Sequence, residues 1–127
     1  MAFTTAGFAA IAGLLISDGT TPFNVTNAYL GVGDDSTAFD PSQTDLNPTV
    51  SGNKLRQLVS TAPTRTGAAI VFTCNFTTGQ ANWQWNENGI FNAASSGTML
   101  TRKVETLVTK TSAATATFTK TLTIAQS

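Results

Sequence analysis

The feature that most constrains the fold of this chain is a pattern of period two in two separate segments. Every second side chain is apolar in residues 69–76, and residues 116–124 alternate in the same way, with Phe118 and Ile124 on the apolar face. Successive side chains of a β-strand point to opposite faces of a sheet, so this period of two predicts half-buried strands. Lys120 lies on the apolar face, which predicts a lysine that is at a sheet edge or in an ion pair.

The stretch from Gln80 to Arg102 contains both tryptophans and the clearest hairpin signal of the sequence. Residues 93–97 form a small, glycine-ended connector of hairpin length, with a strand predicted on each side of it. Trp83 and Trp85 have the same parity and would share one face of the first strand. Two indoles on one face can bury more apolar area than any other pair in the chain, so this strand is predicted to supply the centre of the core.

Glu87 follows the two indoles with the same parity and therefore needs a partner. A carboxylate among aromatic side chains is costly when it is unpaired, and Arg102 or Lys103 on the returning strand is the natural cation. An ion pair is favoured over a catalytic role for this glutamate. The predicted structural core consists of Trp83, Trp85, Glu87, Arg102, Phe72 and Phe118.

Composition favours β-structure and argues against several classes of function. Ser and Thr make up roughly a quarter of the 127 residues, and β-branched threonine suits a half-buried pleated surface. The seven basic and seven acidic residues cancel, so neither a nucleic acid nor an anionic membrane is expected as a partner. A chain near zero net charge tends to associate with other proteins. We predict an all-β fold, an antiparallel β-sandwich of about six to seven strands with a short N-terminal helix.

One domain is predicted for residues 1–127, with residues 1–19 as a helical arm and residues 22–127 as the β-sandwich, which contains a long loop at 34–53. The arm has no basic residue, which argues against a signal peptide, and its apolar run is too short to span a bilayer. Because this run is apolar nearly all round, we expect another subunit to cover part of it. The predicted interface residues are Phe3, Phe8, Ile11, Leu15, Phe39 and Leu46.

Catalytic chemistry has little support in the sequence. There is no histidine, which removes the usual general base and metal ligand. Asp34 and Asp35 are interpreted as turn formers rather than calcium ligands, and Cys74 as a small core residue rather than a reactive thiol. The prediction is therefore a non-enzymatic protein without a catalytic residue, a cofactor or a metal.

Several motifs occur in an order that resembles a family. They are Tyr29-Leu30-Gly31-Val32-Gly33-Asp34, Phe39, Gln43-Thr44-Asp45-Leu46, Lys54-Leu55-Arg56, Trp85-Asn86-Glu87-Asn88-Gly89-Ile90-Phe91-Asn92 and Gly97-Thr98-Met99-Leu100-Thr101-Arg102. Together they resemble small structural proteins of tailed bacteriophages, namely the phage tail-collar fibre group and its relatives, over about residues 23–124. In tail-collar proteins this domain belongs to a much longer fibre, whereas the present chain ends after its last strand, which favours an accessory subunit such as a head decoration (cement) protein.

The resemblance implies a location on the exterior of a phage particle, after synthesis in the cytoplasm of the bacterial host. It also implies a homo-oligomer, with a trimer favoured, that contacts the major capsid protein or tail and collar proteins. The expected function is an exterior capsid decoration subunit that stabilises the head through protein contacts. Two alternatives remain open: a tail, collar or fibre-base protein, and a carbohydrate-binding adhesin that would use exposed tryptophans.

Overall fold

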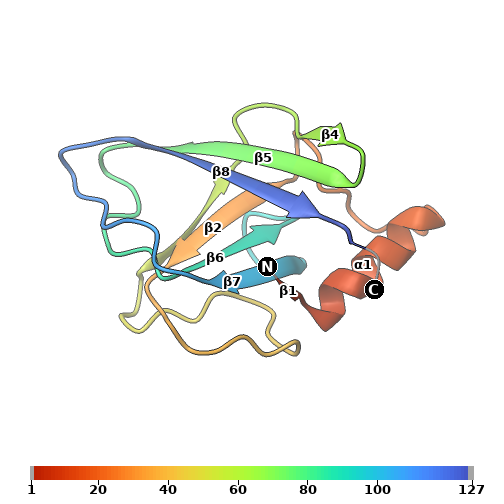
Figure 1. Cartoon of the computed structure of the whole chain (residues 1–127), viewed down its shortest axis with the longest axis horizontal. Coiled ribbons are helices and arrows are strands. Elements are labelled where there is room, and N and C mark those ends of the chain that lie inside the picture. The colour runs from red at the N-terminus through yellow and green to blue at the C-terminus, as the bar shows by residue number, and fades with distance from the viewer. Residues whose placement is uncertain (1, 126–127) are drawn as a thin grey trace.

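The computed structural model describes residues 2–125, so the ends of the predicted domain, Met1 and residues 126–127, lie outside the described residues. Two antiparallel sheets pack face to face and one short helix lies at the N-terminal end, which confirms the predicted all-β sandwich (Figure 1). The elements in chain order are β1 (Ala2–Phe3), α1 (Thr5–Leu15), β2 (Tyr29–Gly33), β3 (Lys54–Leu58), β4 (Thr64–Thr66), β5 (Ala69–Phe76), β6 (Glu87–Phe91), β7 (Met99–Val104) and β8 (Ala116–Thr123).

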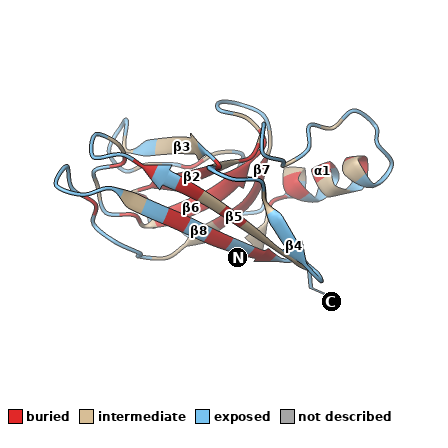
Figure 2. Ribbon diagram, turned by 90° about the horizontal axis from the view of Figure 1, so that it is seen from above, coloured by how far each residue is buried: buried red, intermediate tan, exposed pale blue. Residues whose placement is uncertain are grey.

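The larger sheet has the strand order β1-β7-β6-β2-β3, and the smaller one has the order β4-β5-β8. β5 and β8 pair along their whole length, from Ala69 opposite Thr123 to Phe76 opposite Ala116. Their alternating pattern puts one face of each strand into the sandwich, as the bands of buried and exposed residues on these strands show (Figure 2). The period-two prediction is confirmed for residues 69–76 and for residues 116–123.

The core between the sheets is centred on Trp85, whose side chain is buried. Its indole contacts the rings of Phe76 and Phe118 edge-on, at centroid distances of 5.2 and 5.7 Å. The indole Nε1 donates to the carbonyl of Ala81 at 3.0 Å, which satisfies its one donor. Phe72 is also fully buried in this cluster, whereas Trp83 is only partly buried and packs against its margin.

The long connection at residues 34–53 contains neither a helix nor a strand, and it packs on the face of the larger sheet that points away from the smaller one (Figure 1). The molecule therefore has three layers: the small sheet, the large sheet and this loop. We call residues 34–53 the covering loop.

The stretch around the tryptophans differs from its prediction. A continuous strand was expected from Gln80, but β6 begins only at Glu87, and Ala81 has a positive φ of 55°. The pairing register changes between Glu87 opposite Val104 and the isolated bridge of Gln84 with residue 109. Residues 85 and 86, between the bridge and β6, are not in a strand, so the period of two does not carry through from Trp85 to Glu87. As a result Trp85 points into the sandwich while Glu87 points to the covering loop, so the predicted shared face is wrong.

Residues 24–27 form a turn in which Asn24 Oδ1 accepts hydrogen bonds from two backbone N–H groups, and β2 starts after it at Tyr29. Ile124 was predicted to face inward, yet it lies beyond the end of β8 and is 45% exposed.

Candidate functional site

Behind the covering loop lies a buried ionic network centred on Arg102, whose side chain is completely buried. Its Nε donates to Glu87 at 3.0 Å and its Nη2 to Asp35 at 3.2 Å. Its Nη1 donates to the carbonyl of Thr37 at 3.0 Å and to the side chain of Gln43 at 3.2 Å. The pair predicted between Glu87 and Arg102 is thus present, and it fastens the loop to β6 and β7.

Glu87 is equally buried and receives further donors from the covering loop. The backbone N–H groups of Asp35 and Asn47 donate to its two carboxylate oxygens at 3.3 and 3.2 Å. Burial raises the pKa of Glu87 above its ordinary value, while these hydrogen bonds and Arg102 act in the opposite direction. Its hydrogen-bond partners come from the covering loop and β7, so Glu87 anchors the loop to the sheet.

Glycines on β2 make room for this network. A Cβ on Gly33 would collide with the Glu87 carboxylate, and one on Gly31 would lie 2.7 Å from the ring of Phe91. Only glycine therefore fits at these two positions while the acid and the ring keep their places. The glycine-rich motif Tyr29–Asp34 has a packing explanation, and so do the glutamate and arginine of the later motifs.

Leu46, one of the predicted interface residues, lies buried beneath the covering loop within one copy of the chain. It is 3% exposed and packs with Phe91 and Met99 beneath the covering loop. Leu46 was predicted at an interface as one of the few apolar residues of a long loop, since long ordered loops commonly contact partners. The loop instead folds back on the sheet and buries it.

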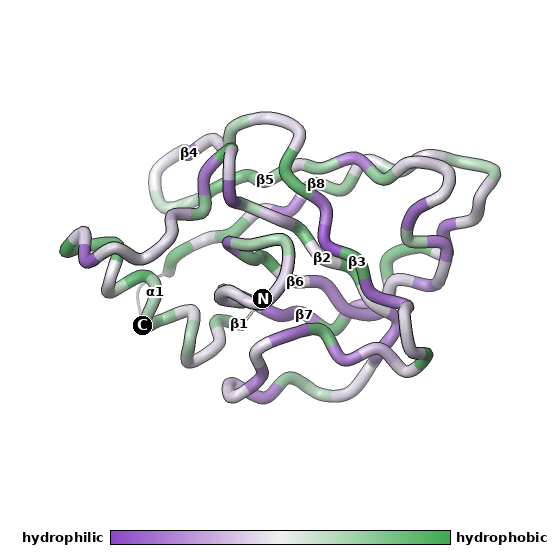
Figure 3. The backbone as a smooth tube through the Cα atoms, turned by 180° about the vertical axis from the view of Figure 1, so that it is seen from behind, coloured by the Kyte–Doolittle hydropathy of each residue, from purple (hydrophilic) through white to green (hydrophobic). Residues whose placement is uncertain are grey.

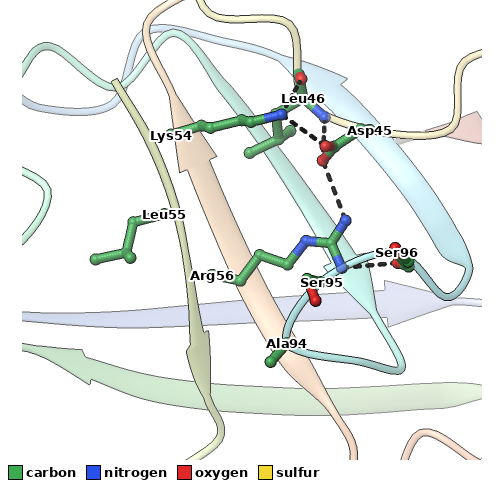
Figure 4. Close-up of a pocket in the computed structure, with 8 residues that line it drawn as sticks. All are labelled: Asp45, Leu46, Lys54, Leu55, Arg56, Ala94, Ser95 and Ser96. Atoms are coloured by element: carbon green, nitrogen blue, oxygen red, sulfur yellow. Dashed lines mark hydrogen bonds and ion pairs between the residues drawn. The ribbon is translucent and has the colours of Figure 1, made fainter. Parts of the chain in front are cut away.

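A shallow polar pocket of about 320 Å³ opens beside β3, between the covering loop and the connector at residues 93–97. Arg56 spans it (Figure 4), donating to Asp45 at 3.1 Å and to the carbonyls of Ala93 and Ser96 at 2.9 Å each, over the face of Phe91. Lys54 donates to the same Asp45 at 2.6 Å. The charged side chains that line this pocket are therefore already paired with each other.

Inside the sandwich, Lys120 pairs with Glu105 at 2.9 Å, and Asn88 donates to the same carboxylate oxygen at 2.9 Å. Burial alone would raise the pKa of Glu105, but these hydrogen bonds and the charges of Lys120 and Lys103 outweigh it and lower the pKa. Lys120 was predicted to lie at a sheet edge or in an ion pair. It lies on the edge strand β8 and is also paired.

Cys74 lies fully buried on β5, and burial raises the pKa of its thiol to about 12. The thiolate, which is the nucleophile and metal ligand, is therefore suppressed at neutral pH. Within residues 2–125, no group of three or more His, Cys, Asp or Glu side chains is placed to hold a metal ion. No helix in the same range is long and apolar enough to cross a membrane.

Helix α1 buries three small residues and exposes two large ones. The buried positions are Gly7, Ala10 and Gly13, while Phe8 and Leu15 are 59% and 81% exposed. The helix approaches β7 so closely that a Cβ on Gly7 would overlap the carbonyl of Leu100. An amphipathic helix normally turns its large apolar residues toward its own core. Here Ile11 packs against the core, but Phe8 and Leu15 point to solvent and leave an apolar face directed outward.

The fold explains how the helix is held in that orientation. Thr4 is its N-cap: the side-chain oxygen accepts from Gly7 N at 2.8 Å, and the hydroxyl donates to the carbonyl of Met99 at 2.5 Å. The backbone N–H of Thr4 donates to Leu100 at 3.1 Å. Because these bonds join the start of the helix to β7, the outward face is fixed.

An apolar groove of about 300 Å³ adjoins the helix, in the region where hydrophobic segments of α1 and the end of β8 meet (Figure 3). None of its lining residues is charged; they are Ile11, Leu14, Leu15, Phe23, Ile70, Phe72, Leu100, Leu122 and Ile124. We call the groove together with the outward face of α1 the apolar end.

The six residues predicted for an interface differ in their burial. Phe8 and Leu15 are exposed at the apolar end, and Leu46 is buried. Phe3 and Ile11 are partly buried and pack against the core, with the Phe3 ring 5.1 Å from that of Phe8. Phe39 is half-buried in the covering loop. The structure thus brings four of the six to one end of the molecule.

Sequence reasoning missed two residues of the buried network and its neighbourhood. Asp35 was taken as a turn former, yet it is 7% exposed and paired with Arg102. Arg56 was noted only as part of a motif, although its side chain is 9% exposed and joins two loops. The available signal was that a buried arginine needs carboxylate partners. This requirement does not say which acid folds back to it.

A scan against protein-family models finds no match to this chain, and a search of the curated proteins finds none either.

Proposed function

We propose that this chain is a non-enzymatic structural subunit of a bacteriophage particle, located on the exterior of the head as a decoration protein. The observation that carries the proposal is the apolar end. A lone soluble protein rarely directs large apolar side chains such as Leu15 and Ile16, 81% and 76% exposed, into water on one contiguous face. Such a face is expected where another protein covers it.

The remainder of the molecule supports an adhesive role. The acids and cations behind the covering loop are engaged in holding that loop, as with Arg102 between Glu87 and Asp35. Residues 34–53 are thereby fixed as an extended, ordered surface, and ordered loops commonly provide contacts with partners. Glu87 and Arg102, which hold this loop, also belong to the motifs that resemble phage structural proteins.

In this role the subunit acts through buried interface area. The apolar end would pack against a neighbouring subunit and the covering loop against the shell, each adding contacts that resist outward pressure on the head. A specific interface buries about 800 Å² on each partner, which requires a substantial part of such a small molecule's surface.

The adhesin alternative required both indoles at the surface. Trp85 is 2% exposed, so a sugar-binding platform made from both tryptophans is not available in this fold. The tail, collar or fibre-base alternative uses the same surfaces and differs only in where the subunit sits.

The test is to separate purified particles of the encoding phage into heads and tails and to probe each fraction with an antibody against this chain. Decoration predicts the chain in the head fraction, accessible to antibody on intact particles. Detection in the tail fraction alone would favour the tail, collar or fibre-base role. Its absence from both fractions would contradict a structural role in the particle.

A further inference from the structure

We infer that the apolar end pairs with the apolar end of a second copy of this chain, through an antiparallel crossing of the two α1 helices about a two-fold axis. The inference takes one premise from the proposed function, namely that the apolar end is a surface for assembly. It adds the partner and the geometry, which the proposed function leaves open.

The first argument is the order of side-chain sizes along the outward face. Alanines at positions 9 and 12 are exposed in the middle of this face, with Phe8 toward one end and Leu15 and Ile16 at the other. In an antiparallel pair crossing near Ala12, Phe8 of each copy meets Leu15 of the second copy, and the alanines allow close approach. A two-fold interface requires such self-complementarity, in which residue i contacts j and j contacts i.

The second argument is charge. α1 contains no charged residue, and neither does the lining of the adjoining groove. Two copies can therefore bury this surface against each other without desolvating an ion or placing like charges together. The net charge of zero adds no repulsion between copies at a distance.

The third argument is area. Phe8, Leu15, Ile16 and Ile124 are 59%, 81%, 76% and 45% exposed. At roughly 200 Å² for a side chain of this size, they present ~500 Å² of apolar surface. A stable interface needs about 800 Å² on each partner. The helix face alone falls short of this area, so the contact must extend over the groove beside Ile11 and Leu14, which is equally apolar.

The test begins with the mass of the purified full chain, measured by sedimentation equilibrium over a range of concentrations. The inference predicts a monomer–dimer equilibrium for the wild type. Leu15→Glu is expected to raise the dimer dissociation constant ~100-fold or more, because each dimer loses two buried leucines and gains two buried charges. Near-UV circular dichroism should stay unchanged, since Leu15 makes little contact within one copy.

A matched control is Val50→Glu in the covering loop. Val50 is 56% exposed and apolar but lies outside the apolar end, so this variant should dimerise like the wild type. An equal loss of dimer in both variants would contradict the assignment of the interface.

Cysteine cross-linking tests the crossing itself. Helices that pack over small residues approach to about 8 Å between axes, which brings the two Ala12 positions within disulfide reach on the axis. Ala12→Cys should therefore form a covalent dimer under mild oxidation, whereas Ala94→Cys in the exposed connector should not. The native Cys74 is fully buried and does not compete.

Three results would overturn the inference: a wild-type monomer at all concentrations, a trimer, or a dimer that Ala12→Cys fails to link. These outcomes are separable from the fate of the proposed function. A monomer that is found on phage heads would refute the pairing alone, and a dimer that is missing from particles would refute the decoration role alone.

Discussion

At the scale of single residues, the most consequential side chain is Arg102. It is completely buried and its guanidinium contacts two buried carboxylates, Glu87 and Asp35, together with two groups of the covering loop. Bidentate and multiple hydrogen bonding is what a guanidinium offers and an ammonium does not. The residue thus compensates two acids that would otherwise be unpaired in the interior.

Arg102→Met should lower the free energy of unfolding by about 3–5 kcal/mol, because it leaves two carboxylates buried without their cation. The measurement is urea denaturation followed by tryptophan fluorescence. Arg65→Met is the control, since Arg65 is exposed and its side chain donates only to the carbonyl of Gly67. Equal effects of the two substitutions would refute the role of the network.

The ion pair of Glu105 and Lys120 gives a pH dependence with a defined sign. The folded protein lowers the pKa of Glu105, so the unfolded chain holds this proton more tightly. The stability that Glu105 contributes is therefore present above the unfolded pKa and is lost as the pH falls through the folded pKa. The difference in unfolding free energy between the wild type and Glu105→Gln should shrink on acidification below about pH 4.5. A difference that grows toward low pH would show that the sign is wrong.

At the scale of elements, local patterns predicted some strands accurately and others poorly. β5 and β8 follow from strict alternation, and Cys74 and Lys120 occupy the predicted faces. The alternation around Trp85 predicted a strand as well, but the backbone there is set by the turn at Ala81 and by a change of register with residues 105–110. Periodicity records which side chains are apolar, whereas a register change depends on the partner strand, which a single segment does not contain.

The candidate site could also be predicted only in part, because some of its features depend on tertiary structure. An exposed apolar arm could be expected from Phe8 and Leu15, because no charged residue interrupts the arm before Asp18. The burial of Leu46 could not be predicted, since it depends on how the covering loop folds over Phe91. The pairing of Asp35 with Arg102 joins residues 67 positions apart and likewise depends on tertiary structure.

The close packing of α1 on β7 predicts an effect of Gly7→Ala on stability that is opposite to the effect expected from helix propensity. Alanine is the better helix former, so Gly7→Ala would stabilise an isolated helix by about 1 kcal/mol. Here the added Cβ would overlap the backbone of Leu100, which cannot rotate away, so we expect a loss of about 1–3 kcal/mol in unfolding free energy.

Gly79→Ala is the matched control for that substitution. A Cβ at Gly79 meets no atom within 4 Å, and its φ is not positive, so the change should be neutral or stabilising by up to about 1 kcal/mol. If Gly7→Ala were also stabilising, the close contact of α1 with β7 would be wrong.

At the scale of the whole molecule, the sheets, the covering loop and helix α1 have separate roles. The two sheets supply the core, the ionic network fixes the covering loop on the outside of the larger sheet, and α1 projects an apolar face from one end (Figure 1). Charged side chains hold the covering loop in place, and large apolar side chains form the outward face of α1. That distribution suits a subunit whose task is to bind its neighbours.

The most direct test of this account is a cryo-electron microscopy reconstruction of the particle, at a resolution that shows the helix. The account predicts density for the β-sandwich on the outer surface of the head, with Phe8 and Leu15 of α1 covered by a neighbouring protein chain. A particle without such density, or one in which the outward face of α1 is bare to solvent, would contradict it.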